Sequence, residues 1–576
     1  MYHTTNSTAA DLKDLIASIH RKSYPACKSL TGSYTFEKFT LTIDHVQGDP
    51  FASPSHISIR VPHRFAGFPA EFFDTPWRKT ALEDALLRAC AAELSKYSFR
   101  AKGSGKSGLL ATSIPGQEIL PRSACQITSH EIILRLEAGF PANGRTIQGQ
   151  ELEKMLLDFI PSCVRAALLY RPEKYAQLQK DIHLADDQHT LRQFLTEHHL
   201  AAFVADGAIL PRESGISQKP MKHAVPFSSP DTLRVSCTLP HHGILTGMGI
   251  REGITLIVGG GYHGKSTLLN ALETGVYNHI SGDGREYVVT DSSALKLRSE
   301  DGRSVRNVDI SLFIKDLPNK KDTTAFYTED ASGSTSQAAA VMEGMESGSH
   351  LFLIDEDTSA TNFMMRDELM QKVIHREKEP ITPFLERARD LFEQDHISTI
   401  LVAGSSGAYF YIADTIIQLD HYLPYDITAQ ALAASRSYPA PAIKAPRYHI
   451  GMFHRIPEHK AEHPAQKKHT SRENHLQKIK VYGKDCFLLG KDTIELRYLS
   501  QLADCEQTNT LAHLLRYAQT HYFNGAYTLT EIVDLLEDEL AKNQFQNICG
   551  SRFVPSGLCI PRRQEIFSCF NRYRKL

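Results

Sequence analysis

Apolar residues recur along the first third of the chain with two different periods. Spacings of three and four residues predict helices over 12–20, 78–94 and 149–169. Alternation with polar residues predicts strands within 34–46, 55–62 and 131–141. Helices and strands do not alternate one by one here, so the pattern indicates an α+β domain.

The pattern changes between about 236 and 420, where short apolar runs alternate with loops and helices. Such runs are typical of strands buried on both faces of a sheet. They lie at 254–260, 286–291, 350–355, 398–404 and 415–420. The middle of the chain is therefore predicted to be an α/β domain.

Two biased stretches mark the end of this region. Residues 431–446 are rich in Ala and Pro, 454–480 are rich in Lys, Arg and His, and helical patterns follow. We expect three domains. They are an α+β domain over 1–170, an α/β domain over 171–446, and a mainly helical domain with basic segments over 447–576.

The composition is that of an ordinary globular protein. The chain has 576 residues, of which 41% are hydrophobic and 23% charged. Its net charge of −2 gives no overall attraction to nucleic acid, so such binding has to come from local patches. No apolar run approaches the ~18 residues of a membrane span. The ten cysteines are scattered singly, and we expect a soluble protein with reduced thiols in the cytoplasm.

The strongest chemical signal is ITLIVGGGYHGKSTLLNAL at 254–272. A glycine, four residues and Gly-Lys-Ser-Thr stand between an apolar strand and a helix, as in a phosphate-binding loop. In such a loop the backbone amides surround phosphate, the lysine neutralises phosphate oxygens and the serine hydroxyl binds Mg²⁺. The sequence therefore predicts ATP and Mg²⁺ as ligands. The expected contacts are Gly259, Gly260, Gly261, Gly264, Lys265, Ser266 and Thr267, with Ser266 on the metal.

A similar stretch, FRAKGSGKSGLLATS at 99–113, lacks two parts of this arrangement. Arg100 stands where the first glycine is needed, and no run of β-branched residues precedes the loop. We interpret it as a flexible basic loop.

A second signal is HLFLIDEDTSATNF at 350–363. Asp355 ends an apolar strand, where a carboxylate can hold Mg²⁺, and Glu356 follows where a base or a water-positioning group is needed. We expect Asp355 to serve the metal and Glu356 to be catalytic. Taken alone, the stretch is equally compatible with an acidic turn.

Between these motifs, SGSTSQ at 332–337 resembles the signature SGGxxQ of ATP-binding-cassette (ABC) ATPases, and DEDTSA at 355–360 resembles their DEPTSA. The resemblance implies that the signature residues contact nucleotide bound by another subunit. It also implies a head-to-tail homodimer that encloses two ATP molecules. The signature residues are Ser332, Gly333, Ser334 and Gln337.

The whole chain resembles a family described as predicted ATPases of the ABC class. The resemblance implies a P-loop ABC-type ATPase core, flanked by an α+β N-terminal domain and a mainly helical C-terminal domain, with no transmembrane partner. It also implies that GSGKSG belongs to the N-terminal domain and is no second nucleotide site. The segments that carry it are 43–55, 103–110, 141–149, 259–269, 308–318, 331–339, 355–367, 560–566 and 571–576.

Three positions depart from ordinary ABC ATPases. No glutamine for a Q-loop lies between Asn270 and Gln337. Gly404 or Ser405 stands where the switch histidine is expected, and Asn362 where an aspartate is usual. We therefore expect slow turnover, with ATP serving chiefly to close the dimer.

Two functions remain open for the flanking domains. One is an ATP-hydrolysing switch whose dimer closes on nucleic acid, RNA more than DNA, as the resemblance suggests. The other is a nucleotide-gated scaffold for protein partners with negligible hydrolysis. The candidate phosphate contacts are Arg60, His63, Arg64, Arg78, Lys79, Lys102, Lys106, Lys467, Lys468, Arg562, Arg563, Arg572, Arg574 and Lys575.

The segment IDHVQGDPFASPS at 43–55 also allows two interpretations. Asp44, His45 and Asp49 are close enough in sequence to suggest a catalytic set. A structural turn started by Asp49-Pro50 is the favoured interpretation, because proximity in sequence is weak evidence for convergence in space.

Overall fold

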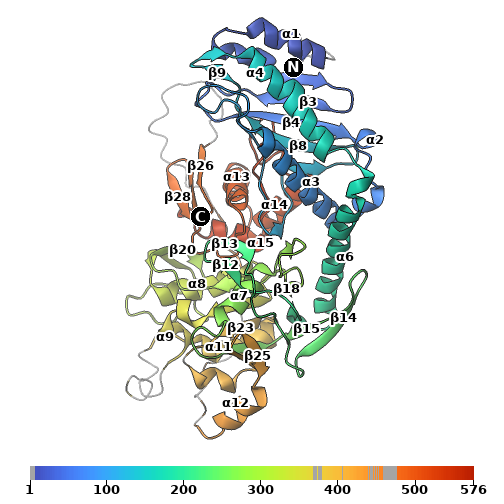
Figure 1. Ribbon diagram of the computed structural model, residues 1–576. Helices are drawn as coiled ribbons and strands as arrows, with labels where there is room; N and C mark the ends of the chain where they lie inside the picture. Colours follow the sequence, from blue (N-terminus) through green and yellow to red (C-terminus); the bar gives the residue numbers. More distant parts are fainter. Residues whose placement is uncertain are drawn as a thin grey trace. The chain divides into compact units, whose positions relative to one another are not determined.

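The computed structural model describes residues 7–366, 379–404, 406–438, 453–457 and 477–576, together with the isolated positions 373, 440, 445, 448 and 451. The chain divides into two compact units (Figure 1). One is Met1–Asp186 with Phe545–Ile560, and the other is Asp187–Gln544 with Pro561–Leu576. None of the described helices is both long and apolar enough to cross a lipid bilayer.

The first unit is built on a seven-stranded sheet in the order β1-β2-β3-β4-β8-β5, with β7 also paired to β8. Its strands are β1 (Ser7–Thr8), β2 (Gly32–Thr35), β3 (Thr40–His45), β4 (Ser55–Pro62), β5 (Leu110–Ala111), β7 (Cys125–Ile127) and β8 (Glu131–Ala138). Its main helices are α1 (Ala9–Ile19), α3 (Pro76–Tyr97), α4 (Gly149–Lys154) and α5 (Ile160–Ala167). The α+β pattern predicted for this part is confirmed.

One face of this sheet carries the core. Alternate residues of β4, namely Ile57, Ile59 and Val61, are buried in one cluster with apolar residues of α1, α3 and α5. Thr8 and Thr75 accept hydrogen bonds from the first turns of α1 and α3 and so fix where these helices begin. The helix predicted over 149–169 is interrupted by a π-helical turn at Met155–Phe159, between α4 and α5.

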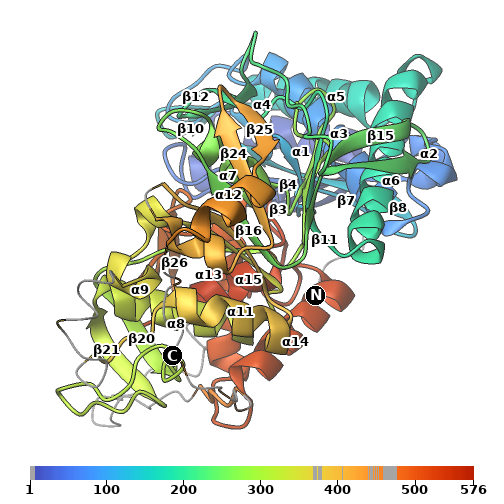
Figure 2. The same ribbon diagram turned by 90° about the horizontal axis from the view of Figure 1, so that it is seen from below.

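The second unit contains a six-stranded sheet in the order β19-β22-β23-β16-β24-β25. The strands β16, β24 and β25 are labelled in Figure 2. These strands are β19 (Leu295–Leu297), β22 (Leu351–Asp355), β23 (Ser398–Val402), β16 (Ile254–Val258), β24 (Thr415–Asp420) and β25 (Leu423–Asp426). All neighbours are parallel except β24 and β25. The helices of this region are α7 (Lys265–Thr274), α8 (Gly333–Glu346), α9 (Thr361–Met364), α11 (Phe384–Asp395) and α12 (Thr428–Ser435).

Both faces of this sheet are buried. Leu256, Phe352 and Leu401 share a core cluster with residues of α8 and α11. The alternate positions Ile257 and Leu353 are equally buried, and they point to the opposite face because side chains alternate along a strand. Covered faces explain why these strands read as continuous apolar runs.

One strand predicted for this sheet lies elsewhere. The run at 286–291 forms β18 (Val288–Thr290), which pairs with β11 (Leu200–Ala205) in an antiparallel sheet of order β14-β15-β11-β18. The other two strands are β14 (Arg234–Leu239) and β15 (Gly243–Arg251). The edge place in the parallel sheet is taken by β19, whose sequence LKL is too short and mixed to give a signal.

The rest of the second unit holds small sheets and helices. There are hairpins of β12 (Arg212–Ser214) with β13 (Ser217–Pro220) and of β20 (Arg303–Val308) with β21 (Phe326–Ala331). A three-stranded meander of β26 (Ile479–Tyr482), β27 (Cys486–Leu489) and β28 (Asp492–Glu495) precedes the C-terminal helices. These are α13 (Cys505–His521), α14 (Leu529–Asn543) and α15 (Arg563–Phe570), so the predicted helical character of the C-terminal region is confirmed.

Candidate functional site

Four loops meet at the carboxyl edge of the parallel sheet. The register aligns Ile257 of β16 with Val402 of β23, and Val402 with Asp355 of β22. On the other side of β16, Val258 is aligned with Gln418 of β24. The segments that follow these strands therefore emerge side by side, which is where α/β sheets bind their ligands.

The loop after β16 can be built only with glycine at two positions. Gly259 has φ +141°, and a Cβ there would lie 2.4 Å from the carbonyl oxygen of Leu419. Gly264 has φ +101° and stands directly before α7. Tyr262 between them has φ +65° and a fully exposed side chain. A backbone held in this conformation is typical of a loop that wraps around a phosphate group.

Lys265 and Ser266 open helix α7, where the free amide groups of a helix N-terminus favour anions. The Lys265 ammonium donates hydrogen bonds to the carbonyl oxygens of Gly259 at 2.7 Å and Gly260 at 2.9 Å. Its side chain is therefore folded back onto the phosphate-binding loop. Ser266 is exposed. Leu268, Leu269 and Leu272 anchor the other side of the helix in the interior.

Asp355 and Glu356 follow β22 at this edge. Asp355 is nearly buried, and one of its carboxylate oxygens accepts the backbone N–H of Asp357 at 3.2 Å. Glu356 accepts the backbone N–H of Gly404 at 2.6 Å. Gly404 follows β23 at the place expected for a switch histidine. At this position the contact with Glu356 is therefore made by a main-chain amide. Ser405, the other residue considered for that place, lies outside the described residues.

The signature residues begin helix α8. The Ser332 hydroxyl lies 3.0 Å from that of Thr335 and 3.5 Å from that of Ser334. Gln337 is fully buried and turns toward the loop after β22. It donates to the Ser359 hydroxyl at 2.9 Å and accepts the Ala360 N–H at 2.8 Å. In this structure Gln337 therefore ties the signature helix to the loop that carries Asp355 and Glu356.

A cavity of about 320 Å³ adjoins the phosphate-binding loop. Sequence reasoning missed it, because the loop that forms one wall has no periodic pattern. The lining is mostly apolar and includes Leu210, Met221, Val225, Phe227, Thr267 and Tyr422. Its size and polarity suit a flat, weakly polar group such as a nucleotide base.

The basic residues named from sequence differ in their surroundings. Several are held in ion pairs within their own unit, as Arg78 is with Asp186, Arg563 with Asp534, and the buried Arg572 with Glu300. Arg64 and Lys102 are exposed on the first unit. Lys467 and Lys468 lie outside the described residues. Of these residues, the exposed ones are better placed to meet a phosphate backbone.

The three N-terminal segments quoted from sequence come together in space. The Lys106 N–H donates to the carbonyl oxygen of Pro50 at 2.8 Å, and the Ser104 N–H donates to that of Ala142 at 2.7 Å. The stretch read as a flexible basic loop is thus a closely bonded turn. Asp49 accepts the N–H groups of Phe51 and Ala52, as the structural interpretation of 43–55 expects.

Three family models match the chain in succession. One described as the N-terminal part of ATPases of the ABC class matches residues 9–171, and one described as the P-loop domain of ABC ATPases matches residues 174–455. The third, the MRB1590 C-terminal domain, matches residues 478–576.

Individual proteins match over shorter stretches. "Uncharacterized protein MJ1628" of Methanocaldococcus jannaschii is 33% identical over 189 residues, which cover 31% of this chain and 42% of that protein. The match thus spans about two fifths of the length of this relative.

Solved structures also match. One is cbiO1 from Clostridium perfringens, part of the ABC transporter complex cbiONQ, with 12% identity, a TM-score of 0.26, and coverage of 41% of this chain and 92% of that chain. Another is a bacterial Atm1-family ABC exporter with ATP bound, with 14% identity, a TM-score of 0.25, and coverage of 51% and 52%.

Proposed function

The chain belongs to the ATPases of the ABC class, whose N-terminal and P-loop domains it carries, and from that premise we propose that it binds and hydrolyses ATP as a head-to-tail homodimer. The nucleotide state of the dimer controls the binding of a partner, which we propose to be RNA. All ten cysteines are thiols, which supports a reducing compartment such as the cytoplasm.

The observation that carries the proposal is the meeting of three groups at one sheet edge. The glycine-dependent loop at Gly259 follows β16, and the carboxylates of Asp355 and Glu356 lie at the end of β22. Both strands pair in register with β23, which lies between them. A triphosphate on this edge has amides and a lysine at one end and two carboxylates at the other. This is the arrangement that phosphoryl transfer to water requires.

The residues present fit Mg²⁺, and each has a separate role in the proposed reaction. The exposed Ser266 hydroxyl and the Asp355 carboxylate would hold Mg²⁺, which supplies charge neutralisation for the phosphate oxygens. Lys265 exchanges its carbonyl partners for phosphate oxygens. Glu356 orients the attacking water and takes its proton, while one of its carboxylate oxygens accepts the Gly404 amide.

The base of the nucleotide is proposed to enter the apolar cavity beside Thr267. Met221 lines this cavity and is 42% exposed, so Met221→Trp would fill part of the space with a larger side chain. The variant is expected to weaken ATP binding while leaving the affinity for inorganic tripolyphosphate unchanged. Equal losses for both ligands would contradict this placement of the base.

The dimer is proposed because the signature serines lie at the N-terminus of α8 and not at the phosphate-binding loop of the same chain. Ser332 and Ser334 present hydroxyl groups beside the free amides of that helix end. In a head-to-tail pair, this helix end meets the γ-phosphate held by the loop of the other copy.

The test is ATP turnover by the purified chain at one stated salt concentration, alone and with total RNA, single-stranded DNA or duplex DNA. Glu356→Gln serves as the matched variant, because it keeps the size of the side chain and removes the base. We expect RNA to stimulate turnover and Glu356→Gln to abolish the stimulated rate. If only DNA stimulates turnover, the partner is DNA and not RNA. If no polymer affects turnover, the nucleotide-gated scaffold for protein partners is favoured.

A further inference from the structure

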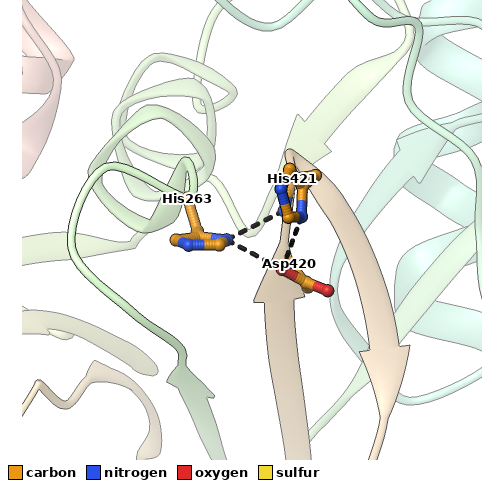
Figure 3. A group of neighbouring side chains, drawn as sticks. All are labelled: His263, Asp420 and His421. Carbon is orange, nitrogen blue, oxygen red and sulfur yellow. Dashed lines mark hydrogen bonds and ion pairs between the residues drawn. The ribbon is translucent and has the colours of Figure 1, made fainter.

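We propose that His263, Asp420 and His421 form a binding site for one divalent transition-metal ion of the zinc type, built into the phosphate-binding loop (Figure 3). His263 belongs to that loop, and Asp420 and His421 end β24 and begin the turn to β25. The metal site itself stands on these three side chains. Only its effect on nucleotide rests on the proposed function.

The three side chains converge closely. The Nδ1 atom of His263 lies 2.9 Å from Oδ1 of Asp420, and the Nδ1 atom of His421 lies 2.8 Å from the same oxygen. The two imidazole rings are 5.1 Å apart and nearly perpendicular, at 79°. One potential ligand atom from each residue lies within 4.8 Å of the other two. Ligand atoms of a tetrahedral zinc ion are ~3.4 Å apart, so none of the three separations has to change by more than about 1.5 Å.

The chemistry of the set points to a particular class of ion. Two imidazoles and one carboxylate are the ligands of zinc sites that keep an open position, and they suit Co²⁺ and Ni²⁺ as well. Mg²⁺ and Ca²⁺ prefer oxygen ligands and are disfavoured here. Because Asp420 is about half exposed and His421 is 84% exposed, an ion can enter from solvent and keep one or two waters.

The surrounding contacts fix His263 in place. The edge of its ring lies over Gly260, where a Cβ would come within 3.1 Å of the ring carbon Cδ2. Its carbonyl oxygen accepts the N–H of Tyr422 at 3.2 Å. The ring therefore directs Nδ1 to the 420–422 turn. The protein itself fixes this orientation, so the ligand is preorganised for a metal ion.

Metal binding at this place would move the turn. The Nδ1 atom of His263 now accepts the backbone N–H of His421 at 2.9 Å, and its single lone pair cannot serve both this N–H and a metal. The N–H is released to solvent, which costs little at such an exposed residue. Since Tyr422 lines the cavity beside Thr267, occupation of the metal site is coupled to the proposed base pocket.

The test uses the full chain without a histidine tag, freed of metal by a chelator that is then removed. Co²⁺ is titrated in, and its visible absorption reports ligand number and geometry without reference to ATPase activity. We expect one Co²⁺ per chain with the intense spectrum of a four- or five-coordinate ion, and displacement by Zn²⁺. His421→Ala and Asp420→Asn are each expected to weaken binding by at least about tenfold.

The matched control is His199→Ala. His199 is as exposed as His421 and also faces a carboxylate, Glu252 at 3.5 Å, but belongs to no three-residue cluster among the described residues. Its loss is expected to leave the Co²⁺ affinity unchanged. If His199→Ala weakens binding as much as His421→Ala, or if neither His421→Ala nor Asp420→Asn changes the spectrum, the proposal is overturned.

Lys265→Ala separates the metal site from the nucleotide site. This variant is expected to lose ATP binding and to keep the Co²⁺ spectrum. Retained ATP binding would count against the proposed function and leave the metal site standing. Loss of the spectrum in this variant, with circular dichroism unchanged, would show that the three side chains alone do not hold the ion.

Discussion

The backbone N–H of Gly404 donates a hydrogen bond of 2.6 Å to the carboxylate of Glu356, joining the ends of two neighbouring strands. An amide cannot replace the proton chemistry of a switch histidine, but it can hold the carboxylate at the edge of the sheet. A carboxylate offers about four acceptor positions, so Glu356 can keep this bond and still accept a hydrogen bond from water.

Replacing Glu356 by Gln is expected to separate closure from hydrolysis. The variant keeps an acceptor for the Gly404 amide but loses the base, so turnover falls by about 10²-fold or more. With ATP and Mg²⁺ it is expected to accumulate as a dimer, which sedimentation velocity detects. If it remains monomeric at saturating ATP, then hydrolysis-arrested dimers are not part of the mechanism.

Replacing Lys265 by Ala is expected to abolish ATP binding without unfolding the chain. The ammonium contacts only carbonyl oxygens of its own loop, so its removal leaves no buried partner charge. Calorimetric titration with ATP and Mg²⁺ measures the effect. Lys315→Ala is the control, because Lys315 is an exposed lysine of the same unit. Undiminished affinity in Lys265→Ala would remove the core of the proposed function.

Replacing both Ser332 and Ser334 by Ala is expected to weaken ATP-dependent dimerisation and to spare ATP binding by the monomer. Ser332 is exposed and Ser334 is buried, and the Ser332 hydroxyl lies beside those of Ser334 and Thr335. Alanine is smaller than serine and needs no hydrogen bond, so the folded state should persist. The substitutions are best compared in the Glu356→Gln background, where dimer formation can be measured at equilibrium. An unchanged dimer constant would contradict the role given to these serines.

Replacing Gln337 by Ala is expected to destabilise the second unit. The change leaves the partly buried Ala360 N–H without its acceptor and the Ser359 hydroxyl without its donor. Each such loss costs about 1–3 kcal/mol of unfolding free energy. Chemical denaturation measures it, and Gln337→Met is the comparison because it fills nearly the same space and removes both hydrogen bonds without burying a charge. If Gln337→Met costs nothing, the hydrogen bonds of Gln337 are not what holds the loop.

The stability of the first unit is expected to rise as the pH falls from 8 to 6. Burial raises the pKa of Glu83 to about 7, although its carboxylate accepts the Ile127 N–H and lies 3.8 Å from the Lys79 ammonium. A folded-state pKa above the unfolded value means that the folded chain binds the extra proton, so protonation stabilises it.

Glu83→Gln tests this source of pH dependence. The amide oxygen can still accept the Ile127 N–H, and no charge has to be buried. We expect the variant to gain ~1–3 kcal/mol at pH 8 and little at pH 5. Thermal unfolding at the two pH values measures the difference. An equal gain at both would place the cause elsewhere.

Sequence patterns predicted the strands β16, β22, β23 and β24 of the parallel core because each of them had a local signal, whereas β19 had none. Ile254–Val258 and Leu351–Asp355 are uninterrupted apolar runs, and each ends in residues with recognisable chemistry. The order of the strands was beyond such reasoning, since β16 and β23 are joined by pairing across more than a hundred residues. The assignment of β18 to the parallel sheet failed for the same reason.

The functional site could be predicted from sequence where its residues belong to one short motif. Gly259 and Lys265 lie within one motif, whereas Glu356 and Gly404 meet only through the sheet register. A signal for the metal cluster did exist, because Asp420 and His421 follow an apolar strand just as Asp355 does. Asp420 and His421 meet His263 only because β24 lies beside β16, and no local sequence pattern reveals this pairing.

The segment Phe545–Ile560 has a consequence for the order in which the protein can fold. Ser123 donates its backbone N–H to the carbonyl oxygen of Leu558 and its hydroxyl to that of Pro555. The Phe553 ring stacks on His45 and makes a tilted contact with His56. Because synthesis runs from the N-terminus, the first unit lacks this segment until residues up to 560 have been made. Throughout that interval Ser123, His45 and His56 are without these partners, so the first unit can complete its fold only after most of the second unit has been synthesised.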